Sequence, residues 1–324
     1  MSDIYRYDPT KTATARSLFA RRFMSRYRYV KYLLRESVVV NLCFGNPKAI
    51  RYEDDSNMTD DDLFSDIIND YDRLLATDPW VKDAYPLKKY ALDGLDESDQ
   101  AETFLKWMSY ILGVVMLSKI TSPEKEDYIW VHSYIMAAYL HGIKWGKQRL
   151  KANKKLVSRI GANNAIFDTS DTSLYLALTN SYHQDNIKKL IVIYSNLINS
   201  QIETILSKSS LILTDSSILN GSPNNIYNKL RDVIGSAGTA RGAILANTES
   251  IRAHHWSSVT EYRLADADGV MVMAEWETAR DSKVCPTCSR LDYKTTKKLW
   301  SIDEIMSMIP VHPRCRCAAI PHYN

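Results

Sequence analysis

The sequence predicts a mostly helical protein that ends in a small α+β domain. Apolar residues recur at three- and four-residue steps through most of the first 256 positions, which is the period of amphipathic helices. An alternating pattern typical of a β-strand occurs at residues 269–277. Four of the five cysteines lie beyond residue 284, in two short turns. We therefore expect an elongated helical N-terminal region and a small C-terminal β element closed by its cysteines.

Length and composition allow two domains in a folded, soluble chain. The 324 residues are 45% hydrophobic and 24% charged, which excludes an intrinsically disordered chain. Helical periodicity fades after about residue 157, so the predicted regions are residues 1–165 and 166–324. The polar N-terminus does not resemble a secretory signal. The longest uncharged stretch, residues 128–143, is shorter than the roughly 20 residues of a membrane span, so no membrane partner is expected.

Four helices are predicted in the N-terminal region. They cover residues 14–40, 57–77, about 100–122 and about 126–156. Phe19, Phe23 and Tyr27 begin the apolar stripe of the first helix. The aspartates of the second lie in its first turns, where the helix dipole favours them. Pro123 separates the third helix from the fourth.

The charges are segregated along the chain. Residues 11–35 carry eight bases and no acid, residues 53–72 nine acids and no base, and residues 144–159 seven bases and no acid. Such blocks are typical of solvated faces or of surfaces that contact phosphate or an acidic partner. We interpret the acidic run as a solvated face and the basic blocks as contacts. The predicted contact residues are Arg16, Arg21, Arg22, Arg26, Arg28, Lys144, Lys147 and Arg149.

The C-terminal region is predicted to combine helices with one strand. A helix covers residues 186–206, and residues 221–256 form two shorter helices that break near Gly235–Gly238. The strand at residues 269–277 follows. Ser301 and Glu304 have the spacing of a capping box and predict a short helix between the two cysteine turns.

The two cysteine turns predict a structural zinc site. Cys285 and Cys288 have the C-x2-C spacing of a zinc knuckle, and the second turn offers His312, Cys315 and Cys317. Tetrahedral Zn²⁺ needs four such ligands. Cys285, Cys288 and Cys315 are the preferred three, and the fourth position is open between His312 and Cys317.

Other uses of these cysteines fit the sequence less well. Disulfides require an oxidising compartment, and nothing at the N-terminus directs export. A C-x-x-C redox centre normally begins a helix in a thioredoxin-like βαβ unit, which is not the pattern here. Few acids or histidines flank the cysteines to activate a water molecule. The zinc site is therefore predicted to be closed and structural.

Three segments together resemble a known family. They read GTARGAILANTESIRAHHW at 238–256, GVMVMAEWETARDSKVCPTCSRLD at 269–292 and IPVHPRCRC at 309–317. In order and spacing they resemble the C-terminal signature of the phage Mu F-like head morphogenesis proteins, over roughly residues 175–321. The signature residues outside the cysteine turns are Thr248, Glu249, Trp276 and Asp281.

Two positions depart from the family pattern. Asn247 stands where the family commonly has an arginine, so any ion pair of that arginine is absent here or comes from another group, such as Arg241 or Arg252. A glycine that often follows the second cysteine is also missing. Neither departure affects the candidate metal ligands.

The resemblance implies a minor capsid protein of a tailed bacteriophage. Such proteins are present in few copies inside the head, associate with the portal protein, and affect head assembly and the packaging or ejection of DNA. It implies a location in the virion near the portal, after assembly in the host cytoplasm. Scaffold and major capsid proteins are further expected partners. The basic segments fit non-specific contact with packaged double-stranded DNA.

Two other classes of function were weighed. One is an enzyme: a toxin-like transferase that uses Glu249, or a metal-dependent nuclease that uses His254 and His255. The sequence has no glycine-rich phosphate loop and no Ser-His-Asp arrangement, so we predict no catalytic residues. The other class is a free zinc-containing nucleic-acid-binding protein, but no recognition-helix pattern adjoins the cysteines.

Overall fold

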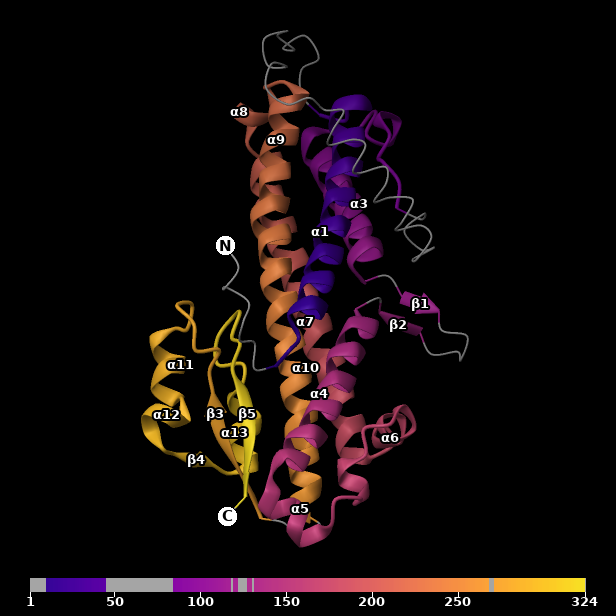
Figure 1. Cartoon of the computed structure of the whole chain (residues 1–324). Helices are drawn as coiled ribbons and strands as arrows, with labels where there is room; N and C mark the ends of the chain where they lie inside the picture. The colour runs from indigo at the N-terminus through magenta and orange to yellow at the C-terminus, as the bar shows by residue number, and fades with distance from the viewer. Residues whose placement is uncertain are drawn as a thin grey trace. The chain divides into compact units, whose positions relative to one another are not determined.

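The computed structural model describes residues 10–44, 84–117, 119–121, 127–129, 131–267 and 271–323 (Figure 1). The predicted helix at 57–77 and the acidic run at 53–72 lie outside these residues. The chain forms two compact units. The knuckle unit comprises Met1–Phe19, Val131–Tyr194 and Ile244–Asn324, and the helical unit comprises Ala20–Trp130 and Ser195–Ala243.

The predicted fold class is confirmed: the protein is mostly helical and has a small antiparallel sheet near its C-terminus. The units are not consecutive in sequence, because helices α1, α7 and α10 contribute residues to both. Residues on both sides of the predicted boundary at 165 belong to the knuckle unit. Among the described helices, none has the length and apolar character needed to cross a membrane.

The helical unit contains most of the N-terminal elements. Its elements are the later part of α1 (Ala13–Arg35), the π-helix η1 (Glu36–Val40), the 3-10 helix η4 (Lys89–Ala91), α3 (Glu97–Leu117), the hairpin β1 (Lys119–Thr121) and β2 (Asp127–Ile129), the later part of α7 (Ser181–Leu213), α8 (Ser216–Leu219), α9 (Pro223–Val233), the π-helix η6 (Ile234–Thr239) and the start of α10 (Ala240–Ala267). As the stripe predicts, Phe23 and Tyr27 of α1 are buried. Tyr27 donates a hydrogen bond to Gln201 of α7 over 3.0 Å.

The predicted break near Gly235–Gly238 is wrong. α9 continues through η6 into α10, and the chain stays helical throughout. A Cβ on Gly238 would lie only 2.5 Å from Cε1 of Tyr27, so this glycine allows a close approach between η6 and α1. Glycine is therefore needed here for packing. The helix does not break at this point but widens into the π-helical turn η6.

The knuckle unit is built around α10. Its other elements are α4 (His132–Ala152), α5 (Lys154–Ile160), the 3-10 helix η5 (Ala165–Phe167), α6 (Asp171–Ala177), the first part of α7, β3 (Val272–Glu277), α11 (Pro286–Leu291), α12 (Tyr293–Thr296), β4 (Leu299–Trp300), α13 (Ile302–Met308) and β5 (Ala318–Tyr323). α4 packs closely on α10: a Cβ on Gly142 would lie 1.9 Å from Oγ of Ser257. Only glycine fits at this position.

The three-stranded sheet has the order β4-β3-β5 and is antiparallel throughout. Trp276 of β3 lies opposite Ala319 of β5. The predicted alternation is present, since Val272, Ala274 and Trp276 are buried. Tyr262 of α10 donates a hydrogen bond to the Ala319 carbonyl over 3.2 Å and joins helix and sheet.

Candidate metal centre

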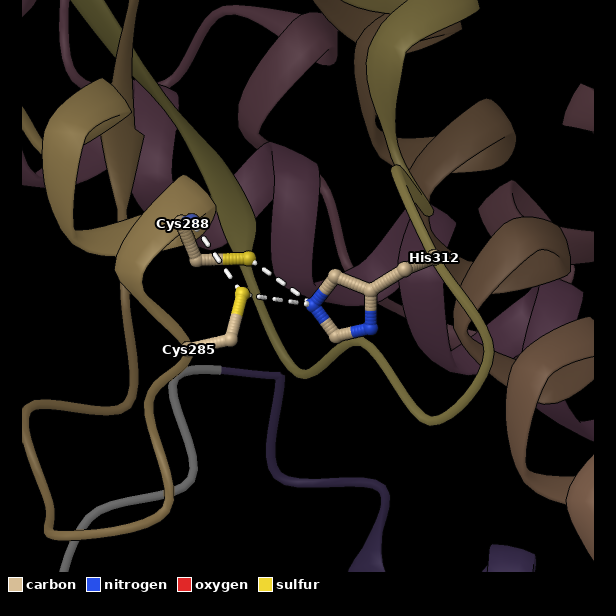
Figure 2. A group of neighbouring side chains, drawn as sticks. All are labelled: Cys285, Cys288 and His312. Atoms are coloured by element: carbon tan, nitrogen blue, oxygen red, sulfur yellow. Dashed lines mark hydrogen bonds between the residues drawn. The ribbon is translucent and has the colours of Figure 1, made fainter.

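The first cysteine turn is the N-terminus of α11. Cys285 is the N-cap, and its Sγ accepts a hydrogen bond from the Cys288 amide over 3.3 Å. Pro286 occupies the first turn, where its missing N–H costs nothing and its fixed φ suits the helix. This local geometry holds the two sulfur atoms on the same side of the turn, as Figure 2 shows.

His312 approaches this pair from the second turn. Its Nε2 lies 3.2 Å from Sγ of Cys285 and 3.1 Å from Sγ of Cys288 (Figure 2). In a tetrahedral zinc site, Zn–S bonds of about 2.3 Å and Zn–N bonds of about 2.0 Å place the sulfur and nitrogen ligands about 3.5 Å apart. The observed distances from Nε2 to the two sulfurs would therefore have to lengthen only slightly. Nδ1 lies 2.8 Å from the Pro313 carbonyl. We assign the ring proton to Nδ1, which leaves the Nε2 lone pair directed at the two sulfurs.

Cys315 and Cys317 form a second group with Cys288. The Sγ atoms of Cys288, Cys315 and Cys317 all lie within 4.8 Å of one another, and the donor atoms of Cys285, Cys288 and His312 meet the same limit. Cys288 belongs to both groups. Cys315 and Cys317 are 0% and 3% exposed. All five predicted donors therefore converge, with Cys288 at the centre.

The sulfur atoms are too crowded to be thiolates together without a cation. Hydrogen bonds from Cys288 and Cys317 lower the pKa of Cys315 to about 2. The pKa of Cys288 is raised far above its usual range, mainly by its hydrogen bond with Cys315 and next by that with Cys317. The negative charge is thus favoured on Cys315 and disfavoured on Cys288. A bound divalent cation would remove this conflict, because metal binding displaces thiol protons.

Outside the donor atoms, two contacts hold the second turn in place. Asp281 accepts two hydrogen bonds from Arg316, over 2.6 and 2.7 Å, and this lowers the pKa of Asp281. Thr248 on α10 accepts a hydrogen bond from the Arg314 amide over 3.0 Å. Trp276 is fully buried in the core cluster that includes Cys288, Cys315 and Cys317. The signature residues Thr248, Trp276 and Asp281 are therefore brought to one place.

The residues considered for catalysis have structural partners. Glu249 is 4% exposed and accepts a hydrogen bond from Nε of Arg252 over 2.7 Å. Arg252 is one of the two arginines expected as substitutes for the family arginine. His255 Nε2 lies 2.8 Å from the Ile305 carbonyl, whereas the ring of His254 packs against Trp145 at 5.2 Å between centroids. The two histidines therefore face different neighbours.

The predicted contact residues differ widely in exposure. Arg16 and Arg26 are 6% and 0% exposed, so the prediction that these two face DNA or the portal is wrong. Lys147 is also buried, and its Nζ lies 3.5 Å from Glu261. The prediction fails because helical residues beside an apolar stripe are drawn into the core. Arg21 and Lys144 are exposed, while Arg22, Arg28 and Arg149 are half-buried.

Sequence reasoning missed Asp292. This aspartate is 5% exposed and caps α12 through the Lys294 amide over 2.9 Å. Its other oxygen accepts hydrogen bonds from the amide and hydroxyl of Thr278, over 3.0 and 2.7 Å. Burial alone would raise the pKa of Asp292, but these hydrogen bonds outweigh it and the pKa is lowered. An aspartate directly before a short helix is the signal that could have found it.

Comparison with protein-family models, with curated proteins and with solved structures found no match. The chemistry of the centre is therefore inferred from its donor set. Four sulfur atoms and one imidazole, and no carboxylate within this group of described residues, could hold a metal ion. Such soft donors favour zinc or a similar thiophilic metal.

Proposed function

We propose that this chain is a structural minor head protein of a tailed bacteriophage. In this role it associates with the portal inside the head, contacts packaged DNA without sequence preference, and contributes to head assembly and to packaging or ejection of the genome. Scaffold and major capsid proteins are further proposed partners. The proposal is for a protein without catalytic function, located in the virion after assembly in the host cytoplasm.

One observation carries the proposal. The five Cys and His donors lie close together, and the signature residues Thr248 and Asp281 contact the second turn, although these residues span roughly 70 positions in sequence. Thr248 and Asp281 tie the second turn to α10 and to the segment before α11. Such an arrangement supports a closed structural site, because the donors contact one another and Asp281 is paired with Arg316.

Zinc is the proposed metal, held by Cys285, Cys288, Cys315 and His312. His312 is preferred for the fourth position because its Nε2 lies within 3.2 Å of both knuckle sulfurs. When bound, zinc would supply a rigid cross-link and no chemistry of its own. Elemental analysis tests the assignment: about one zinc per chain should be retained by Cys317→Ser and lost by His312→Ala. The reverse pattern would give the fourth position to Cys317.

Association with the portal tests the functional role. The full chain should be retained by the portal protein encoded in the same phage genome when the two are coexpressed, and mass spectrometry should find it in purified virions. Cys285→Ser, which breaks the metal centre, is the informative variant for head assembly. Absence of the chain from virions would overturn the proposal, whatever its metal content.

A further inference from the structure

The segment that carries the metal centre also carries dense positive charge. Exposed cations lie along residues 282–298, and a further one lies in the second cysteine turn. We call this set the cationic surface: Lys283, Arg290, Lys294, Lys297, Lys298 and Arg314. Three acids lie near these cations: Asp281 binds Arg316, Asp292 is buried, and the exposed Glu304 partly offsets the charge of Lys298. The positive charge of this surface is therefore largely uncompensated.

The elements that carry most of these cations are neighbours in the knuckle unit. α11 and α12 lie together beside β3, away from α10 (Figure 1). Lys283 and Arg314, which are 31 positions apart in sequence, flank one small hollow at Cys285 and His312. The metal centre thus joins the two segments that supply the cations.

The surface is polar between its charges. Five exposed hydroxyl groups lie among the cations, on Ser282, Thr287, Ser289, Thr295 and Thr296. Among described residues between 272 and 310, no large apolar side chain is exposed. Protein partners are usually bound through buried aromatic and aliphatic anchors, and among the described residues of this surface Val311 of the second turn, 39% exposed, is the one large apolar side chain available for this. Cations and hydroxyls are the groups that bind a phosphate backbone.

The aromatic residues of the segment are covered by its lysines. Nζ of Lys298 lies 3.5 Å from the centre of the Trp300 ring, and Nζ of Lys297 lies 5.3 Å from that of Tyr293. Single-stranded nucleic acids are bound through aromatic rings on which bases stack. Here the rings contact lysine ammonium groups instead of bases, an arrangement that favours contact with the phosphates of a duplex.

Two of the cations occupy positions that favour glycine. Lys297 and Arg314 have φ angles of 54° and 61°. A left-handed backbone costs a non-glycine residue about 1 kcal/mol. Lys297 is the C-cap of α12, where glycine is the usual residue. The contact of Lys297 with Tyr293 offsets part of this backbone cost, and the choice of lysine over glycine is consistent with a role for its charge.

We propose that the cationic surface binds the phosphate backbone of double-stranded DNA without sequence preference. The inference deepens the proposed function by replacing the N-terminal helix as the main DNA contact. The choice of DNA over double-stranded RNA rests on that function, because the chemistry of the two backbones is shared. Portal association is not required for the binding itself.

Salt-dependent binding of the metal-loaded full chain to a duplex of arbitrary sequence tests the proposal. Log affinity should fall linearly with log salt concentration, with a slope of about 0.9 per phosphate contact. Lys297→Gln/Lys298→Gln should make the slope less negative by about 1.8 and weaken binding about 30-fold at roughly 0.15 M salt. Lys188→Gln/Lys189→Gln removes two adjacent exposed lysines from α7 of the same unit and should change neither quantity.

Lys297→Gly separates binding from folding. Glycine suits the left-handed C-cap, so this variant should fold at least as stably as the parent and still bind DNA several-fold more weakly. Equal losses in the 297/298 and 188/189 variants, or an unchanged slope in both, would overturn the proposal. So would equally salt-sensitive binding of polyglutamate, which would indicate an acidic protein partner. Weak DNA binding with intact portal retention would refute this surface and the proposed DNA contact, and would leave the proposed role at the portal standing.

Discussion

Two basic segments of this chain have similar composition and opposite exposure. In α1, arginines alternate with a complete apolar stripe, and Arg16 and Arg26 are buried with it. In the segment around α11 and α12, the cations are exposed and the helices are too short to carry a stripe. The comparison shows that charge density in sequence does not determine which face meets solvent. Burial of the neighbouring apolar residues decides it.

The two segments are also held in place by different means. α1 is fixed by packing of its aromatic residues, whereas α11 begins at Cys285, a candidate metal ligand. A change that disrupts the packing of α1 should therefore leave α11 folded, and a change that disrupts the candidate metal site should leave α1 folded.

Metal removal should give the largest effect. Structural zinc contributes about 10 kcal/mol or more in small domains, so Cys288→Ser or chelation should release α11, α12 and the second turn. Hydrogen exchange should show lost protection over residues 286–300 and retained protection over residues 19–34 of α1. Loss of protection in both segments would mean that the metal supports the whole chain.

Removal of a buried arginine should give the next largest effect. Arg26 donates a hydrogen bond to the Val115 carbonyl inside the helical unit. Arg26→Ala should lower the free energy of unfolding by about 3 kcal/mol, because it leaves a cavity and a buried carbonyl. The control is Arg21→Ala, an exposed position on the same helix, which should change it by less than about 0.5 kcal/mol. Denaturant titration measures both, and equal values would contradict the buried position of Arg26.

Acid should act on the knuckle unit selectively. All seven histidines lie in that unit, and burial lowers the pKa of His255 to about 4. In the unfolded chain this ring is protonated near pH 6.5. The contribution of the neutral buried ring to the free energy of unfolding is therefore complete above pH 6.5 and is lost as the pH falls towards 4. The loss amounts to about 3 kcal/mol. His255→Gln should flatten the dependence of stability on pH between 6.5 and 4, and an unchanged slope would contradict a neutral buried ring.

The smallest expected effect concerns the one ion pair in the second turn. Asp281→Asn removes the carboxylate that Arg316 holds with two hydrogen bonds. Both side chains are about one-quarter exposed, so the cost should be about 1 kcal/mol. Thermal unfolding of the metal-loaded protein measures it, beside Asp303→Asn as an exposed control. A similar change in both variants would remove any special role of the Asp281 pair.

Several features of the fold were predictable because they depend on local chemistry. Helical periodicity located α1, α3, α4 and α7, and alternation located β3. Ser301 and Glu304 form the predicted capping box. The sequence also pointed to the five candidate metal donors that the structure brings close together, since knuckle spacing requires two ligands on the same side of one short turn.

Other features depend on contacts between distant residues and could not be read from spacing. The glycines near 238 look like a helix break, and only the Tyr27 ring against them explains a continuous helix. The burial of Lys147 follows from Glu261, which lies more than 100 positions later. Both cases involve a partner that no local pattern specifies.

The sequence by itself determined most of the long helices, the strand β3, the candidate metal donors and the amount of positive charge. The tertiary structure alone decided which donors meet, which arginines are buried and which cations share a surface. The physical reason is range: periodicity, capping and knuckle spacing act within a few residues. Burial and charge compensation depend on segments that meet only when the chain has folded.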